Sequence, residues 1–145
     1  MKIMNDDKNI NIAIVGLGQV GIYLYNELRF KKKDIEIKTG RKINIVAISA
    51  KNINKKRRFK IDKKIFFKDP LKIFKNAKID ILFEVIGMSD GISKKIVETA
   101  IKNKTHVITP NKALISKHGD SLSKLAELNN VNLEFEASVA GGIPI

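Results

Sequence analysis

A glycine-rich turn stands between the first apolar segment and the first amphipathic segment of the chain. Residues 10–15 form a short apolar run that is typical of a buried parallel strand. Glycines follow directly at positions 16, 18 and 21, and Val20, Leu24 and Leu28 then recur every four residues along one helical face. The pattern predicts a strand, a tight turn and a helix in immediate succession.

The spacing of these glycines has a chemical interpretation. Gly16 permits the tight turn, Gly18 lets the backbone approach a diphosphate, and Gly21 lets helix and strand pack closely. The unpaired N–H groups at the start of the helix then attract the anion. The alternative is that the glycines only make a tight turn. We expect contacts with a dinucleotide from Gly16, Leu17, Gly18, Gln19, Val20 and Gly21.

The rest of the chain alternates apolar runs with helical patterns. Further strands are expected at residues 44–50, 80–86, 106–109 and 133–137, with a weak one at 65–67. Helices are expected at residues 69–74, 92–101 and 113–129, with Gly119 a candidate break in the last. Residues 31–42 and 51–64 are expected to be solvated connections. The alternation predicts a single α/β domain of the Rossmann type over residues 10–145, doubly wound with a mainly parallel sheet, after a disordered or extended N-terminus at residues 1–9.

The end of the second strand bears on the choice of dinucleotide. An enzyme that uses NAD usually has a carboxylate there to hold the ribose 2′-hydroxyl. This chain has Ala50 and Lys51 at that point, and residues 55–58 are Lys-Lys-Arg-Arg. A cation in this place favours a 2′-phosphate, so we expect NADP to be preferred over NAD. The alternative is that these residues are ordinary surface cations.

Composition limits the other function classes. The net charge of +13 invites a nucleic-acid interpretation, but the 28 basic residues are 24 Lys and only 4 Arg, spread along the chain. Arginine is the residue that binds phosphate in a bidentate manner, so we expect a solvated basic surface and no specific nucleic-acid partner. The chain has no cysteine, no apolar run of membrane-spanning length and no export signal at its polar N-terminus. We expect no membrane partner and a cytoplasmic location.

Three further segments hold polar residues near strand ends. Glu84 lies in an apolar strand, where it could shape a ligand site or equally point to solvent or to a helix N-terminus. Lys112 follows the Thr109-Pro110-Asn111 turn at the start of a helix, an electrostatically unfavourable place that hints at catalysis, although an ordinary surface lysine is the simpler interpretation. The small-residue segment 134–144 could hold a hard cation or be an ordinary loop.

Together these segments resemble the N-terminal cofactor domain of homoserine dehydrogenase in order and spacing. The matching segments are residues 15–21, 83–87, 107–114 with His118-Gly119, and 135–144. The resemblance implies interconversion of aspartate 4-semialdehyde and homoserine with NAD(P)H, in threonine and methionine biosynthesis. It also implies a homo-oligomer formed through a substrate and dimerisation domain, which these 145 residues lack. We therefore expect the isolated chain to be inactive.

The resemblance also assigns roles to residues. Lys112 would be the catalytic lysine near the reacting carbonyl and would also contact the cofactor. The other cofactor contacts implied, beyond the glycine-rich turn, are Ala50, Lys51, Ile86, Gly87, Thr109, Asn111, Ala137 and Gly142. A monovalent-cation site, typically for sodium, would comprise Glu136 with the carbonyl groups of Val139, Gly141 and Ile143.

Two departures and two alternatives remain. The family usually has Ala at the position of Pro110 and often Gly at that of Met88. Because Pro110 restricts the backbone, we expect a small shift of the turn that precedes Lys112. The chain could instead be a catalytically inactive dinucleotide-binding module, a regulator or a fragment that needs a separate substrate domain. It could also be another Rossmann dehydrogenase, such as a dihydrodipicolinate reductase or an aspartate dehydrogenase. Neither of those families has the Asn111-to-Leu114 and Glu136-to-Pro144 segments in this arrangement.

Overall fold

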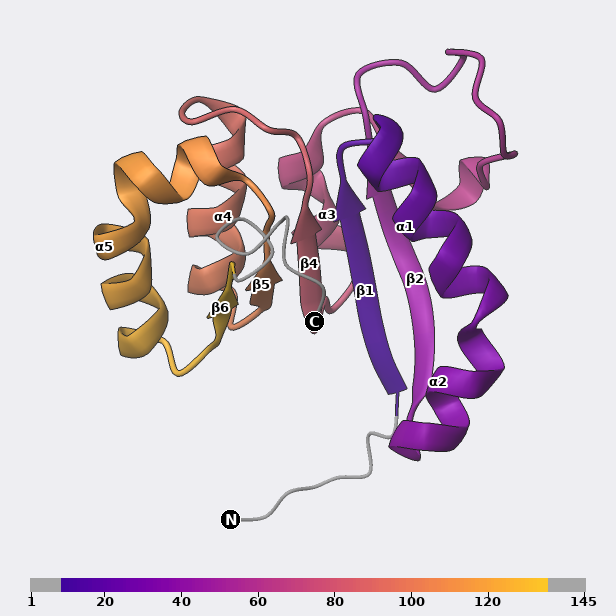
Figure 1. Cartoon of the computed structure of the whole chain (residues 1–145), viewed down its shortest axis with the longest axis horizontal. Coiled ribbons are helices and arrows are strands. Elements are labelled where there is room, and N and C mark those ends of the chain that lie inside the picture. Colours follow the sequence, from indigo (N-terminus) through magenta and orange to yellow (C-terminus); the bar gives the residue numbers. More distant parts are fainter. Residues whose placement is uncertain (1–8, 136–145) are drawn as a thin grey trace.

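A computed structural model describes residues 9–135 of the chain as one sheet covered by helices (Figure 1). The sheet has six strands, all parallel, in the order β3-β2-β1-β4-β5-β6. The strands are β1 (Asn9–Val15), β2 (Lys42–Ser49), β3 (Phe66–Phe67), β4 (Ile81–Glu84), β5 (His106–Ile108) and β6 (Leu133–Glu134). The predicted α/β fold with a doubly wound, parallel sheet is confirmed.

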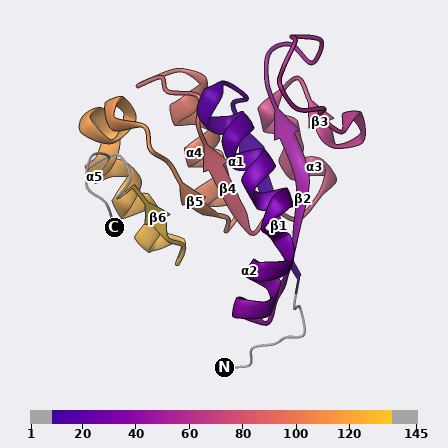
Figure 2. The same cartoon turned by 45° about the vertical axis from the view of Figure 1, so that its right-hand side comes forward.

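The helices lie on both sides of this sheet (Figure 2). They are α1 (Gln19–Phe30), α2 (Lys32–Thr39), α3 (Ile73–Asn76), α4 (Ile92–Lys102) and α5 (Lys112–Leu128), with short 3₁₀ turns at Lys63–Ile65 and Pro70–Lys72. The Asp69 carboxylate caps the second of these turns by accepting the N–H of Leu71 at 3.0 Å, as the Asp-Pro pair predicts.

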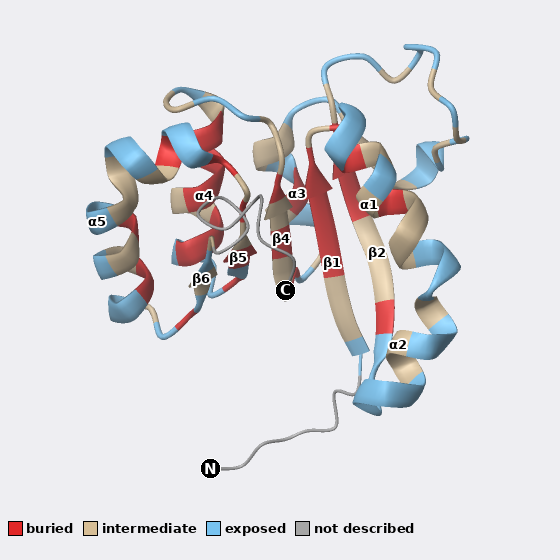
Figure 3. Cartoon of the chain, in the orientation of Figure 1, coloured by how far each residue is buried: buried red, intermediate tan, exposed pale blue. Residues whose placement is uncertain are grey.

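Alternation along β1 divides the core into two clusters. Ala13 and Val15 point to the face that α3, α4 and α5 cover, whereas Ile12 and Ile14 point to the face that α1 covers. Both faces of the strand are buried, which is why it reads as a continuous apolar run. Figure 3 shows the buried residues along β1 and β4 and on the inner sides of α4 and α5.

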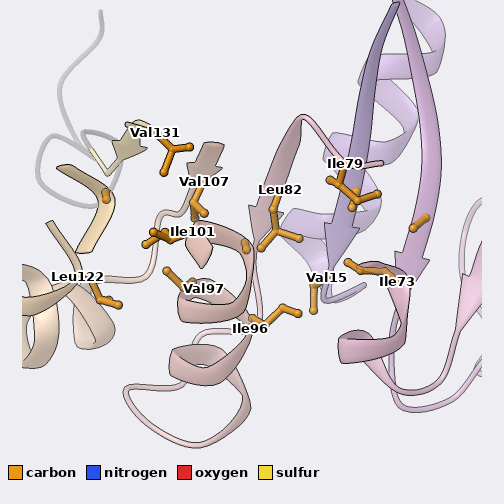
Figure 4. Close-up of a cluster of buried hydrophobic side chains, with 14 of the residues drawn as sticks. Val15, Ile73, Ile79, Leu82, Ile96, Val97, Ile101, Val107, Leu122 and Val131 are labelled. Atoms are coloured by element: carbon orange, nitrogen blue, oxygen red, sulfur yellow. The ribbon is translucent and has the colours of Figure 1, made fainter. Parts of the chain in front are cut away.

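The larger cluster is built mainly by α4. Ile96, Val97 and Ile101 occupy one face of that helix and pack against Leu82 of β4 and Val107 of β5 (Figure 4). Burying each such aliphatic side chain contributes about 1.5–3 kcal/mol. This packing fixes the carboxyl ends of β4 and β5 in relation to each other, and both strands carry site residues just beyond those ends.

Two sequence expectations differ from the structure. Residues 31–42 are not a solvated connection throughout, because residues 32–39 form α2. Its Glu36 carboxylate accepts the N–H of Ile43 at 3.0 Å, and Gly40 ends it in the left-handed conformation (φ 70°). No apolar stripe in the sequence indicates this helix, since it buries no residue completely. The candidate break at Gly119 is absent, and α5 is continuous.

The strand order creates a crevice at one edge of the sheet. The chain moves outward from β1 to β2 and β3, and then returns to place β4 on the other side of β1. The loops that follow β1 and β4 therefore leave in opposite directions at the carboxyl edge. Ligands of open α/β sheets bind at this switch point.

Candidate cofactor-binding site

The turn after β1 needs its first glycine for two reasons. Gly16 has a φ of +107°, which residues with a side chain rarely adopt. A Cβ atom there would also lie 2.7 Å from the carbonyl carbon of Val85, just after β4. The N–H of Gly16 donates to the carbonyl oxygen of Ser49 at 2.8 Å, so the turn is tied to β2 as well. The tight turn predicted from the glycine spacing is confirmed.

Gly21 is crowded by protein atoms, whereas Gly18 faces open space. A Cβ atom on Gly21 would overlap the carbonyl oxygen of Gly16, so this glycine lets α1 pack against the turn. A Cβ atom on Gly18 would meet nothing within 4 Å. Gly18 is also the N-cap of α1, and no side-chain hydrogen bond caps the helix there. The open side of Gly18 thus exposes a helix N-terminus, the feature that binds a diphosphate.

A cleft of about 560 Å³ opens at this point, above the carboxyl ends of β1, β2 and β4. Its described lining residues are Val15, Gly16, Leu17, Gly18, Ser49, Ala50, Lys51, Asn52, Lys55, Arg57, Lys68, Pro70, Val85, Ile86, Met88 and Ile92. The volume lies within the range of ordinary cofactor and ligand sites. The cleft occupies the switch point that the strand order defines.

One side of the cleft is strongly basic. Lys51, Lys55, Arg57 and Lys68 line it, and none of its described lining residues is acidic. The Arg57 guanidinium donates to the carbonyl oxygens of Ile53 and Lys55, both at 3.3 Å, while its Nε atom is buried without a hydrogen-bond partner. A buried, unpaired N–H of a guanidinium is unfavourable unless an anion or water accepts it.

Glu84 sits at the carboxyl end of β4 with no exposed surface. Its Oε1 atom accepts the N–H of Ile86 at 2.8 Å and that of Gly87 at 3.3 Å. Its Oε2 atom accepts the hydroxyl of Thr109 at 2.6 Å and the side-chain amide of Asn111 at 3.2 Å. Of the alternatives that the sequence left open, a position facing solvent is therefore excluded, and the carboxylate shapes the neighbouring loops.

The turn before α5 places Lys112 as the first residue of that helix, with an exposed side chain. Asn111 is the N-cap, and its Oδ1 atom accepts the N–H of Leu114 at 3.1 Å. Its Nδ2 atom donates to Glu84 and, at 2.7 Å, to the carbonyl oxygen of Met88. The side chain of Asn111 is thus engaged within the protein, which leaves the backbone of this turn and the Lys112 ammonium for a ligand.

A second set of contacts joins the segment after β4 to α5. The Asp90 carboxylate lies 2.5 Å from Lys117 Nζ and 2.7 Å from His118 Nε2. The hydrogen bond from Lys117, and then that from His118, hold the pKa of Asp90 well below its usual range. His118 of the sequence motif therefore has a physical role, because it anchors this segment.

The structure brings only part of the predicted cofactor set to the cleft. Gly16, Leu17, Gly18, Ala50, Lys51 and Ile86 line it. Residues that do not line it are Gln19, Val20, Gly21, Gly87, Thr109, Asn111 and Lys112. Gly21, Thr109 and Asn111 are buried, and their contacts support the turns. The remaining predicted residues, Ala137 and Gly142 for the cofactor and Glu136, Val139, Gly141 and Ile143 for the cation, lie outside the described residues.

Sequence analysis missed several residues of the cleft. Lys68 and Pro70 follow β3, and Met88 and Ile92 follow β4. A signal was available for the first pair, because β3 ends at the same edge of the sheet as β2. Its two-residue length and its partly buried side chains made that strand hard to recognise. The sequence marks Met88 only as a departure from the family pattern.

The sequence matches the family model described as the NAD-binding domain of homoserine dehydrogenase over residues 16–136. The chain belongs to this family. It is a nicotinamide-dinucleotide-binding domain of the homoserine dehydrogenase type, and the predicted resemblance is confirmed. Neither a dihydrodipicolinate reductase nor an aspartate dehydrogenase is needed to explain it.

Similar proteins agree with this assignment. The homoserine dehydrogenase of Neisseria gonorrhoeae is 38% identical over 138 residues, which are 95% of this chain and 31% of that protein. A crystal structure of S. aureus homoserine dehydrogenase superposes with a TM-score of 0.85 and 38% identity, covering 94% of this chain and 34% of that one. For the enzyme from Thiobacillus denitrificans the TM-score is 0.83, the identity 33%, and the coverage 94% of this chain and 31% of that one. The chain thus spans about a third of the length of these relatives.

The described residues contain neither a metal cluster nor a membrane-spanning helix. Within residues 9–135, no group of three or more His, Cys, Asp or Glu side chains is placed to hold a metal ion. The helices of the same region are all too short or too polar to cross a membrane.

Proposed function

We propose that the chain is the cofactor-binding part of a homoserine dehydrogenase, which interconverts aspartate 4-semialdehyde and homoserine with NADPH. The observation that carries the proposal is the cleft at the switch point, with an uncapped helix N-terminus at Gly18 on one side and four cations on another. A diphosphate fits the first feature and a 2′-phosphate the second. The reaction is inferred from family membership, and it would be that of a protein as long as the relatives, of which this chain spans about a third.

The residues fit a bound dinucleotide. The open side of Gly18 leaves room for a diphosphate, which a side chain at that position would fill. The cofactor supplies the hydride, and the protein supplies binding, orientation and electrostatics. The Lys112 ammonium, at the first residue of α5, would stabilise negative charge that develops on the oxygen of the reacting carbonyl. In a protein as long as the relatives, the substrate's other contacts would come from residues outside the region that this chain matches.

The proposed preference for NADP rests on the basic side of the cleft. No described carboxylate lines the cleft to hold a ribose 2′-hydroxyl, and the Nε–H of Arg57 lacks an acceptor. A 2′-phosphate would neutralise part of the charge of Lys51, Lys55, Arg57 and Lys68. We expect NADPH to bind this chain more tightly than NADH, and increasingly weakly as salt screens the phosphate contacts.

Arg57 and Arg58 offer a matched pair for the test. Arg57 lines the cleft, whereas the neighbouring Arg58 lies over the ring of Phe59 at 5.6 Å and is not part of the lining. Arg57→Gln should raise the dissociation constant of NADPH about 10-fold or more, the effect of losing a charge-assisted hydrogen bond, and leave that of NADH nearly unchanged. Arg58→Gln should change neither. Titration calorimetry measures both, and equal affinity of the unmodified chain for NADPH and NADH would refute the preference.

Three further proposals concern the longer protein. A monovalent cation, such as sodium, would bind Glu136 with the carbonyl groups of Val139, Gly141 and Ile143. The homo-oligomer would form through the substrate and dimerisation domain, and the enzyme would work in the cytoplasm. Each follows from the family assignment, and the described residues 9–135 do not bear on them.

A further inference from the structure

The buried carboxylate of Glu84 links two segments that the proposed function uses separately. One segment, Ile86 to Met88, follows β4 and contributes to the cleft wall. The other, Thr109 to Asn111, follows β5 and ends immediately before Lys112. Glu84 accepts two hydrogen bonds from each segment, and all four donors are protein groups. Loss of both carboxylate oxygens would therefore disturb both segments.

A direct contact reinforces this link. Asn111 Nδ2 donates to the carbonyl oxygen of Met88 at 2.7 Å, while Met88 in turn donates its N–H to Ser93 Oγ at 3.2 Å. One turn further along α5, Lys117 and His118 hold Asp90. These contacts join the cleft wall after β4 to the first two turns of α5, so we expect the two segments to move together.

The geometry points to Glu84 as a positioning residue that transmits cofactor contact at Ile86–Met88 to the N-terminus of α5, and so holds Lys112 more firmly when the cofactor is bound. The inference rests on the proposed function, because it requires a dinucleotide in the cleft. Glu84 does not touch the cleft and is not itself catalytic. It acts through the hydroxyl of Thr109 and the cap that Asn111 provides.

Glu84→Gln distinguishes the contacts of Glu84 with the segment after β4 from its contacts with the segment after β5. A glutamine has one acceptor oxygen and one donor amide group. Its oxygen can still accept the N–H groups of Ile86 and Gly87, and its amide group then faces Thr109 and Asn111. The Thr109 hydroxyl can rotate to accept, but Asn111 Nδ2 cannot. The substitution should therefore release the turn before Lys112 and leave the cleft wall in place.

The readout is amide hydrogen exchange by NMR, with and without saturating NADPH. The N–H of Leu114 donates to Asn111 Oδ1, so its exchange reports on the cap of α5. The N–H of Ile22 donates to the carbonyl oxygen of Gly18, so its exchange reports on the glycine-rich turn. In the unmodified chain NADPH should slow exchange at both amides, at Leu114 by about 10-fold, a typical size for coupling between sites. In Glu84→Gln the slowing at Ile22 should persist and that at Leu114 should disappear.

A matched pair of threonines controls for lost stability. Thr109 donates its hydroxyl to Glu84 at the carboxyl end of β5, and Thr105 donates its hydroxyl to the carbonyl oxygen of Ile79 at the amino end. Both residues are buried. Thr105→Val removes the hydrogen bond to Ile79, and Thr109→Val removes the one to Glu84 together with the one that the hydroxyl accepts from the N–H of Asn111 at 3.1 Å. Only Thr109→Val should abolish the slowing at Leu114, and Thr109→Ser should restore it. The pair also decides the matter if Glu84→Gln does not fold.

The outcomes are distinct. Retained slowing at Leu114 in Glu84→Gln or Thr109→Val would overturn the role of Glu84, because the Asn111–Met88 hydrogen bond or direct contact with the cofactor would then suffice. An equal loss in Thr105→Val would also overturn it, since general destabilisation would be the cause. Absence of any NADPH effect at Ile22 in the unmodified chain would instead refute the proposed dinucleotide site, and the coupling with it.

Discussion

Gly18 and Gly21 are three residues apart, yet the structure gives them opposite sensitivities to the same substitution. Gly21→Ala would place its Cβ atom on the carbonyl oxygen of Gly16, so we expect a loss of about 2–3 kcal/mol in the free energy of unfolding. Gly18→Ala meets no protein atom and should change that free energy by no more than about 1 kcal/mol. It should nevertheless weaken NADPH binding by about 10-fold or more, because the methyl group would occupy the space of the diphosphate.

Urea unfolding and NADPH titration of both variants check this prediction. Tight binding by Gly18→Ala would contradict the place assigned to the diphosphate. At this scale the sequence predicted well where a residue acts through its own backbone, as the three glycines do. It could not decide the role of Glu84, because the partners Thr109 and Asn111 are 25 and 27 residues away in sequence.

The ion contacts of Asp90 join the β4–α4 segment to α5 and make this attachment sensitive to acid. The pKa of Asp90 is lowered in the folded chain, so its contribution is fully present above the ordinary range, near pH 4, and is lost as the pH falls through the lowered value. We expect Asp90→Asn to lower the urea midpoint at pH 7, and this difference to shrink progressively below about pH 4. The effect should be small, because the carboxylate is half exposed.

Urea midpoints at several pH values measure this effect. Asp120→Asn, which changes an exposed carboxylate on α5, is the matched control and should shift the midpoint much less. A pH-independent difference for Asp90→Asn would show that the lost contact is not ionic. At the element scale the sequence indicated the elements with strong apolar periodicity, such as β1 and α4. It missed α2, which is held by Glu36 and Gly40 and buries no residue completely.

The molecule as a whole carries a cofactor cleft on about a third of the length of its relatives. We expect the 145-residue chain to bind NADPH and to catalyse almost no oxidation of homoserine, because the relatives contain two thirds of their length beyond the matching region. NADPH at 100 times its dissociation constant should raise the melting temperature by about 5–10 °C. A thermal scan and an assay of NADPH formation check the two parts, and robust turnover by the chain alone would contradict the second.

The sequence alone determined the class of the fold, the glycine-rich turn and the family, because these depend on local periodicity and on residues close together along the chain. The tertiary structure decided which cations line the cleft, why Glu84 is buried, and that Asn111 is engaged within the protein. Those properties arise where loops from different strands meet at one edge of the sheet. Sequence spacing does not encode such meetings, since strand order and packing alone bring the loops together.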